Sequence, residues 1–522
     1  MKSFVLHSII AAVLAISTAA ADLVIVNGLI VDGTGAPPIK GSVRVSNGRI
    51  ESVGEANTAN ATIIDAAGRF VAPGFIDVHT HSEQICTLPE AENFLRMGVT
   101  TIVTGNCGTS KTDVGAFFKE MKETGLALNV ATLIGHNSVR EKAMGGMFRR
   151  EPNAAQMAEM KRLVDQAMQD GAVGLSTGLI YLPGTFAKTD EIVELAKVSA
   201  AHGGIYASHI RSESYRIFGA IDEFLTIARE AKIPAELSHI KLSGPSAWGK
   251  ASEVLAILDK ARAEGLKVTH DQYVYTASST SLAQLIPDDA REGGRTAFVK
   301  RVADPVQKAK IMDGMKSILS NSGRDSYDYA VVAQCRHKPE YNGLSVPEIT
   351  KKEKGTDALE SQIETVIEIE CNGGASAVFH GMNEQDLITF LKHPLTMLAS
   401  DGNPRKFGDA VPHPRSYGNN ARLLGKYVRD NKIMTVEEAV RRMAGLPAET
   451  FQLEHRGVLK PGAHADIVVF DLERVADPSQ FDDPHHYAEG FTDVIVAGET
   501  VLHGGKLTGA RPGGPLRFKR GS

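Results

Sequence analysis

The sequence has no dense set of cysteines and no long run of basic residues. Its four cysteines, Cys86, Cys107, Cys335 and Cys371, are too widely spaced for a disulfide framework, so we expect few disulfides or none. The formal net charge is −5, whereas nucleic-acid backbones are bound by a concentrated basic face. A nucleic-acid partner is therefore not expected.

The overall composition is that of a soluble globular protein. Hydrophobic residues make up 43% of the chain and charged residues 23%. A chain of 522 residues is too long for one simple core, so we expect two or more structural units. The 50 glycines indicate many tight turns and close backbone approaches.

The first residues have the pattern of a secretory signal peptide. Lys2 precedes an apolar run, and the small residues Ala19 and Ala21 fit a cleavage site before Asp22. The alternative is an uncleaved membrane anchor, but the run is short and rich in small residues. We expect residues 1–21 to be removed and the protein to be periplasmic or secreted, with no stable membrane insertion afterwards.

Both ends of the mature chain are expected to form β-structure. Two Asn-Gly pairs, Asn27-Gly28 and Asn47-Gly48, lie between strand-like runs, and each predicts a β-hairpin. Two more strand-like runs occur near the C-terminus. We therefore expect residues 22–72 and 454–522 to pair into one small β-sandwich domain.

The long middle part, residues 73–453, alternates strand-like and helical patterns. Repeated βα units of this size predict an α/β fold, a TIM-like (β/α)8 barrel, in which the chemistry lies at the carboxyl ends of the strands. The strand-like runs include Thr100–Gly105, Gly174–Thr177, Ile205–His209, Ala235–His239, Lys267–Asp271 and Thr396–Asp401. The helical patterns between them include Ala154–Asp170, Asp190–His202, Ile217–Ala231 and Ala251–Gly265.

One interval interrupts this alternation. Residues 288–342 are charged and helical, and Pro305 begins one of the helical stretches. We interpret the interval as an insertion between barrel units, placed after a strand end, where a segment can act as a lid over the site. The alternative is a surface elaboration without a role.

The stretch around which the rest of the chain is organised is Val71–His81. Its apolar run ends in His-X-His, and alternate residues of a strand face the same side. His79 and His81 can therefore bind one metal ion between them, since imidazole is the commonest metal ligand.

Four further polar residues follow strand-like runs: Cys107, His209, His239 and Asp401. Taken singly, each has an ordinary structural explanation, such as a buried cysteine acting as a small hydrophobe or an Asp-Gly turn. Together, at successive strand ends of one barrel, they predict a metal site. Histidine, thiolate and carboxylate suit Zn²⁺. A carboxylate beside the metal can take a proton from water, and Asp401 is best placed for this by its order in the chain.

Longer motifs surround these residues. They are Pro73–His81, Gly105–Gly108, Ser176–Tyr181, Ser208–Glu213, Ser238–Lys241, Asp271–Thr276, Ser400–Gly402, His413–Gly418 and Pro461–Asp471. The first resembles the opening metal motif of the amidohydrolase superfamily. The cysteine motif, together with the others, is similar to the D-aminoacylase branch, the N-acyl-D-amino-acid deacylases. The resemblance extends over nearly the whole mature chain.

The resemblance implies a zinc centre with two positions. The tight position would be formed by Cys107, His209 and His239. A second and weaker position, sharing Cys107, would be lined by His79, His81 and Asp401.

The resemblance also implies catalytic and substrate-binding roles. Asp401 would be the general base and acid. Lys241, Tyr181 and Arg415 match motif positions near the substrate. Arg415 would bind the substrate α-carboxylate, because guanidinium binds carboxylate bidentately.

The activity so implied is hydrolysis of N-acyl-D-amino acids to a carboxylate and a free D-amino acid. A second interpretation is a dipeptidase that cleaves L-Xaa-D-Xaa dipeptides, which are N-acyl-D-amino acids with an amine on the acyl group. A cyclic-amide hydrolase is disfavoured by the Cys107 motif, and a non-catalytic assembly protein is disfavoured by the complete ligand set. The expected partner is a small molecule, and the sequence does not indicate the oligomeric state.

Overall fold

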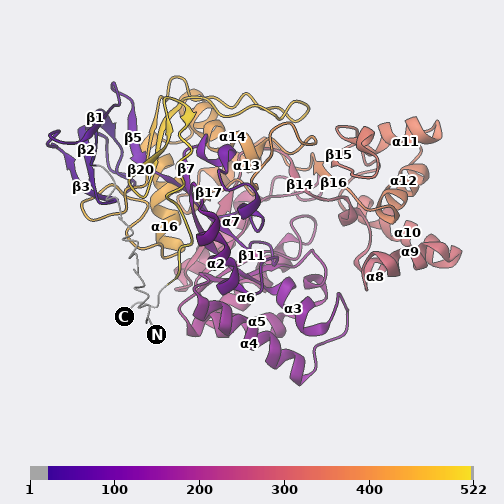
Figure 1. Cartoon of the computed structure of the whole chain (residues 1–522). Coiled ribbons are helices and arrows are strands. Elements are labelled where there is room, and N and C mark those ends of the chain that lie inside the picture. The colour runs from indigo at the N-terminus through magenta and orange to yellow at the C-terminus, as the bar shows by residue number, and fades with distance from the viewer. Residues whose placement is uncertain (1–21, 519–522) are drawn as a thin grey trace, which may run out of the picture.

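The computed structural model describes residues 22–518 (Figure 1). The predicted signal peptide, residues 1–21, lies outside the described residues. At the centre is the predicted barrel of parallel strands, each covered on its outer side by helices. In spatial order its strands are β6 (Phe75–Asp77), β7 (Val99–Thr104), β8 (Asn129–Thr132) with its continuation β9 (Ile134–Gly135), β10 (Gly174–Gly178), β11 (Ile205–His209), β12 (Ala235–Leu237), β13 (Val268–Gln272) and β17 (Thr396–Leu398).

Backbone hydrogen bonds between the ends of the first and last strands close the barrel. The amide of Asp401 donates to the carbonyl oxygen of His79 at 2.9 Å, and the amide of His81 donates to that of Gly402 at 2.8 Å. Segments that lie far apart in the sequence therefore meet at one edge of the barrel.

Apolar side chains fill the barrel. Val103, Ala207 and Met397 from the strands belong to one core cluster with Phe451, which follows helix α16 (Leu446–Thr450). These side chains form a packed core, as in other barrels of this type.

Helices of the predicted pattern surround the barrel (Figure 1). Helices α4 (Ala154–Asp170) and α6 (Ile217–Ala231) have the predicted bounds, and α5 (Thr189–Ala201) and α7 (Ala251–Ala263) differ from them by one or two residues. Helix α4 begins with a capping box of Asn153 and Gln156. Other helices are α1 (Glu92–Leu95), α2 (Val114–Thr124), α3 (His136–Met144), α13 (Glu384–Leu391), α14 (Arg415–Arg422) and α15 (Val436–Val440).

Strands from both ends of the chain lie in one nine-stranded sheet beside the barrel. The two parts join where β18 (Ile467–Phe470) pairs antiparallel with β5 (Phe70–Pro73). The other strands are β1 (Leu23–Ile30), β2 (Ile39–Ser46), β3 (Arg49–Gly54), β4 (Thr62–Asp65), β19 (Phe491–Val496), β20 (Glu499–His503) and β21 (Lys506–Leu507).

One of the two predicted hairpins is confirmed and the other is wrong. Asn47-Gly48 connects the antiparallel strands β2 and β3. Asn27-Gly28 lies inside β1, which continues through both residues. The pairing of β1 with β2 shifts register there, and Asn27 has a φ of 55°. The pair therefore forms a β-bulge, in which a left-handed residue is accommodated without ending the strand.

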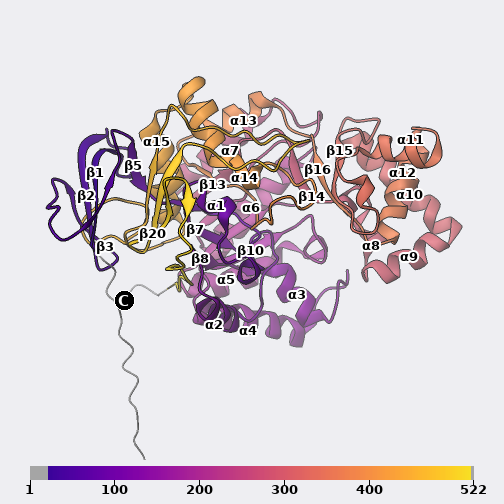
Figure 2. The same ribbon diagram turned by 45° about the horizontal axis from the view of Figure 1, so that its top comes forward.

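An inserted unit follows β13 and projects to one side of the barrel in both ribbon views (Figures 1 and 2). Its core is a separate cluster that includes Leu282, Met315 and Val366. We call residues 278–379 the inserted unit; the predicted insertion, 288–342, lies inside it. Its elements are β14 (Ser278–Ser281), α8 (Asp288–Arg291), α9 (Arg295–Ala303), α10 (Pro305–Asn321), β15 (Ala330–Gln334), α11 (Val346–Lys354), α12 (Leu359–Cys371) and β16 (Ser376–Phe379).

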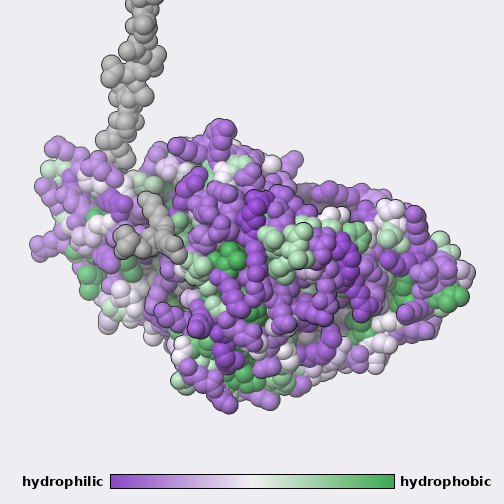
Figure 3. Space-filling view, turned by 90° about the horizontal axis from the view of Figure 1, so that it is seen from below, coloured by the Kyte–Doolittle hydropathy of each residue, from purple (hydrophilic) through white to green (hydrophobic). Residues whose placement is uncertain are grey.

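The face shown in Figure 3 is largely hydrophilic. On the face shown in Figure 3, apolar side chains occur in small, separate patches. No helix within residues 22–518 is long and apolar enough to cross a membrane. All four cysteines are free thiols.

Candidate metal centre and active site

The predicted ligands lie at the carboxyl ends of barrel strands, where the loops begin. His209 is the last residue of β11, and Cys107 lies three residues after β7 ends. The other ligands follow β6, β12 and β17; they are His79, His81, His239 and Asp401. Because the strands are parallel, all of these side chains are delivered to one edge of the barrel.

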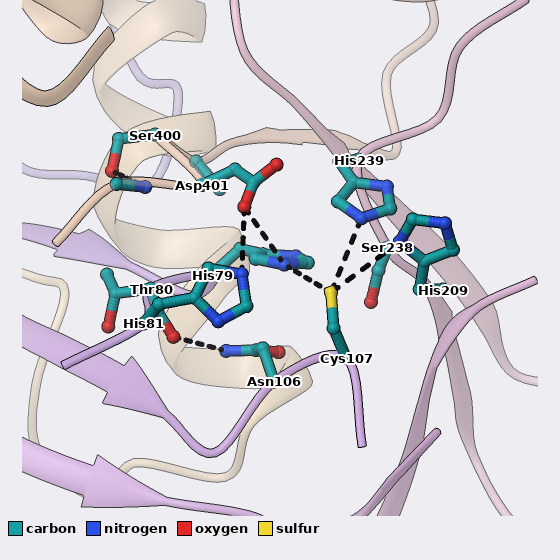
Figure 4. Close-up of polar contacts among 12 residues, drawn as sticks. His79, Thr80, His81, Asn106, Cys107, His209, Ser238, His239, Ser400 and Asp401 are labelled. Carbon is teal, nitrogen blue, oxygen red and sulfur yellow. Dashed lines mark hydrogen bonds and ion pairs between the residues drawn. The ribbon is translucent and has the colours of Figure 1, made fainter. Parts of the chain in front are cut away.

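Three imidazoles converge on the sulfur of Cys107 (Figure 4). The distances from Sγ are 3.3 Å to Nε2 of His79, 3.5 Å to Nε2 of His239 and 3.7 Å to Nδ1 of His209. All four residues are buried. Such a cluster of nitrogen and sulfur donors is the usual composition of a zinc site.

Asp401 lies on the other side of His79 and joins it to His81 (Figure 4). Its Oδ1 atom is 3.1 Å from Nε2 of His81 and 3.7 Å from Nε2 of His79. Its Oδ2 atom forms an ion pair with Arg415 at 2.8 Å. Burial alone would raise the pKa of Asp401, but the charge of Arg415 and the nearby histidines hold it well below its usual range. The carboxylate is therefore ionised.

Three of these residues have left-handed backbone conformations, which are uncommon for residues other than glycine. The φ angle is 52° at Cys107, 37° at His239 and 51° at Asp401. Next to the cysteine, a Cβ atom on Gly108 would lie 2.2 Å from Oδ1 of Asn137, so the motif requires glycine there. Residues held in such conformations are concentrated at functional sites.

Two carboxylates to which the sequence analysis gave no role orient the histidines. Oδ2 of Asp271 lies 3.2 Å from Nδ1 of His79, and Oε1 of Glu213 lies 3.0 Å from Nδ1 of His239. An ionised carboxylate only accepts hydrogen bonds, so Nδ1 of His79 carries the proton and its Nε2 lone pair faces Cys107. Nδ1 of His239 lies between Glu213 and Nζ of Lys241, which is 2.7 Å away. Both carboxylates belong to motifs named in the sequence analysis. Each contacts a histidine from another strand, however, and no sequence pattern indicates such a contact.

Burial favours the uncharged forms of the cysteine and histidine ligands. Burial raises the pKa of the Cys107 thiol well above its usual value and lowers the pKa values of His209 and His239 well below theirs. The uncharged forms of the histidines, which bind metals, are therefore favoured. Three overlapping groups of donors each have their ligand atoms within 4.8 Å of one another, and one of them includes Glu213 with His209 and His239. The donor set thus fits zinc.

A cavity of about 430 Å³ opens over this centre. Of the three predicted substrate-binding residues, Tyr181 and Lys241 line it, together with Asp401, His209 and His239. Arg415 is only 4% exposed and lies behind Asp401 rather than on the cavity wall. The opposite wall comes from the inserted unit and includes Thr280, Ile318, Ser322, Arg324, Tyr329 and Phe379.

Comparison with known proteins agrees with this architecture. The sequence profile of the Amidohydrolase family matches residues 62–303 and 362–502. The chain belongs to the amidohydrolase family. The interval that the profile leaves out, residues 304–361, lies in the inserted unit.

Individual relatives of this amidohydrolase are similar over nearly their whole length. It is 35% identical to N-acyl-D-glutamate deacylase of Alcaligenes xylosoxydans xylosoxydans, covering 92% of this chain and 93% of the relative. It is 33% identical to D-aminoacylase of the same organism, covering 94% and 96%. The crystal structure of N-acyl-D-glutamate deacylase from Bordetella bronchiseptica, complexed with zinc and a phosphonate inhibitor, superposes with a TM-score of 0.81, at 33% identity over 95% of this chain and 99% of that one.

We predict that Asp271→Asn weakens metal binding without unfolding the protein. The amide would no longer hold the proton on Nδ1 of His79, and loss of such a partner lowers metal affinity by about 10- to 100-fold. Titration of the purified protein against a competing zinc chelator measures the effect.

The matched control for this prediction is Asp165→Asn. Asp165 also contacts a histidine, with Oδ1 2.7 Å from Nε2 of His202, but on the outside of the barrel. Equal zinc affinity in wild type and Asp271→Asn would contradict the positioning role.

Proposed function

We propose that this protein hydrolyses the amide bond of N-acyl-D-amino acids and that it uses zinc to do so. The observation that carries the proposal is the donor cluster around Cys107, which lies with the ionised Asp401 at one end of a cavity of about 430 Å³. It is supported by the relatives, which are named as deacylases of N-acyl-D-amino acids, and by the zinc in one of their structures.

The donor geometry suggests which residues hold the metal. We assign Cys107, His209 and His239 to a tight position and His79, His81 and Asp401, sharing Cys107, to a weaker one. A zinc ion there would polarise the amide carbonyl and lower the pKa of a water molecule, to about 7 in zinc hydrolases.

Asp401 moves the proton in this proposal. Because it is ionised, one of its carboxylate oxygens can accept a proton from the water that attacks the amide carbon. Its pKa is held low, so the protonated form readily gives the proton to the amide nitrogen as the carbon–nitrogen bond breaks. The products are a carboxylate and a free D-amino acid.

Tyr181 and Lys241 are proposed to bind the substrate. Burial raises the pKa of Tyr181 well above its usual value, so its hydroxyl stays protonated and can donate a hydrogen bond. Its ring lies edge-on to His209, with centroids 4.9 Å apart. Nζ of Lys241 lies 2.7 Å from Nδ1 of His239, which places a cation beside the donor cluster for the substrate α-carboxylate.

No carboxylate that lines the cavity in the described part of the chain is free to pair with a substrate ammonium group. The carboxylates that line it within residues 22–518 are Glu213, Asp288 and Asp401, and each has a cationic partner. These partners are Lys241, Arg291 and Arg415 respectively. Dipeptides with a free amine are therefore expected to be poorer substrates than simple N-acyl-D-amino acids.

We predict that zinc-loaded mature protein releases amines from N-acetyl-D-amino acids and not from their L-enantiomers, and that Asp401→Asn loses this activity. Removal of a general acid–base typically costs about 10²- to 10⁴-fold in rate. The measurement is amine release over paired D- and L-substrates, with L-Xaa-D-Xaa dipeptides alongside.

The control for Asp401→Asn is Asp409→Asn, an exposed carboxylate in the same loop. Exclusive cleavage of dipeptides would move the function to the dipeptidase, and no turnover of any substrate despite bound zinc would overturn the proposal.

We predict that Arg415→Gln lowers kcat more than it raises KM. In the structure Arg415 pairs with Asp401, so its loss would misplace the catalytic carboxylate, and misplacement on this scale costs about 10²-fold in rate. Arg422→Gln is the matched control, because Arg422 lies on the same helix and contacts a different carboxylate, that of Asp477. A raised KM with unchanged kcat would instead favour direct binding of the substrate α-carboxylate by Arg415.

We also propose that the protein is exported, on the basis of the signal pattern in residues 1–21. Export predicts that the protein recovered from the periplasm or the medium begins at Asp22. Mass spectrometry of its N-terminal peptide measures this, and a chain that retains residues 1–21 would contradict it.

A further inference from the structure

The inserted unit supplies the wall of the cavity that faces the donor cluster. Two backbone hydrogen bonds tie this unit and the residues just after it to the loop that follows Lys241. The amide of Gly244 donates to the carbonyl oxygen of Gly381 at 2.7 Å, and the amide of Ser246 donates to that of Ser322 at 3.2 Å. The wall therefore has a fixed position relative to the barrel.

The carboxylates that line the cavity all have ion-pair partners, but not all of its arginines do. Each lining carboxylate has a cationic partner, as described above. Among the lining arginines, Arg211 pairs with Glu223 and donates to two backbone carbonyls. Arg216 and Arg324 form no ion pair with any residue between 22 and 518. The wall thus carries the guanidinium group of Arg324, which forms no ion pair with a carboxylate in the described part of the chain.

Of these two guanidinium groups, Arg324 is held both by a hydrogen bond and by a ring contact. Gly323, with a φ of 82°, ends the turn after α10 in a conformation that suits glycine and brings Arg324 back towards the cavity. Nη2 of Arg324 donates to the carbonyl oxygen of His380 at 2.9 Å, and its guanidinium carbon lies 4.0 Å from the centre of the Tyr329 ring. A guanidinium has five N–H donors, so donors remain for a ligand.

We propose that Arg324 binds a second carboxylate of the substrate, so that the preferred substrates are N-acyl-D-amino acids with an acidic group beyond the α-carboxylate. The inference rests on the proposed deacylase function and names its substrate class. The acidic group can belong to the amino-acid side chain or to the far end of the acyl group, because both extend from the scissile amide into the same cavity.

The contacts of Arg324 separate this role from binding of the α-carboxylate. The α-carboxylate is only one carbon away from the scissile nitrogen, so its partner has to lie beside the donor cluster, as Lys241 does. Arg324 contacts Tyr329 and the backbone at His380, and none of the proposed metal ligands. Its guanidinium is thus available for a group farther along the substrate. A planar guanidinium can bind a carboxylate there through two N–H groups.

The test compares diacid substrates with monoacid substrates of the same shape, in which an amide replaces the second carboxylate and the α-carboxylate is kept. N-acetyl-D-glutamate is compared with N-acetyl-D-glutamine. N-succinyl-D-alanine is compared with N-succinamoyl-D-alanine, in which an amide replaces the carboxylate at the far end of the acyl group. For zinc-loaded wild type, we expect a kcat/KM at least about 10-fold higher for the diacid of one pair. In Arg324→Gln this preference is lost, with a fall of about 10- to 100-fold on that diacid, the scale of a hydrogen bond to a charged group. The pair that shows the preference identifies the source of the carboxylate.

Two controls make the result specific. Arg324→Gln must keep its turnover of both monoacid substrates, which shows that the variant is folded and loaded with metal. Arg301→Gln removes another arginine of the inserted unit that donates to backbone carbonyls but does not line the cavity, and it must leave all rates unchanged. Equal rates on both members of both pairs in wild type would overturn the inference. So would an equal fall in rate on the diacid and monoacid substrates in Arg324→Gln.

Binding of non-hydrolysable analogues separates this inference from the proposed function. Calorimetry measures the Kd of N-methylphosphonyl-D-glutamate and of its D-glutamine counterpart for the zinc-loaded wild type and Arg324→Gln. Tighter binding of the diacid that is lost in the variant supports the role of Arg324 even if no amide is hydrolysed. Hydrolysis of amides without any such difference in rates or in Kd would leave the deacylase standing and remove the acidic specificity.

Discussion

The hydrogen bonds that close the barrel are the constraint on which the site depends. His79 follows the first strand and Asp401 follows the last, and the amide of Asp401 donates to the carbonyl oxygen of His79 at 2.9 Å. This contact brings an imidazole and a carboxylate from opposite ends of the catalytic part to 3.7 Å from each other. The remaining donors then need only to be at the ends of intervening strands, which a parallel barrel provides by its topology. Without closure, the same residues would be scattered along an open sheet.

The sequence predicts the strands that carry chemistry better than it predicts the relations between them. His209 and Cys107 were predicted because each follows a visible apolar run. The roles of Asp271 and Glu213 could not be predicted, because each depends on a contact with a histidine from another strand. The same limit explains Asn27-Gly28, where a local turn signal was overridden by pairing of β1 on both sides. The contact between Arg415 and Asp401 is likewise one that no sequence pattern indicates.

The donor cluster and the cavity wall that faces it come from two bodies with separate cores. The barrel strands supply the donors and Asp401, whereas the inserted unit packs around Met315 and Val366 and supplies the facing wall. The charge balance follows the same division: the carboxylates near the reacting groups are paired, and the uncompensated guanidinium of Arg324 is on the inserted unit. A change of residues in that unit can therefore alter the electrostatics of the cavity while the donor cluster stays intact.

The left-handed backbone at Cys107, His239 and Asp401 sets stability against function. A residue with a Cβ atom pays about 1–2 kcal/mol for this conformation, a cost from which glycine is largely free. Replacing these residues with glycine would therefore stabilise the fold and would also remove metal ligands. Repeated selection of this chain for thermal stability alone would favour variants that have lost metal ligands and activity. Engineering of a more stable variant therefore has to select for bound metal or turnover at the same time.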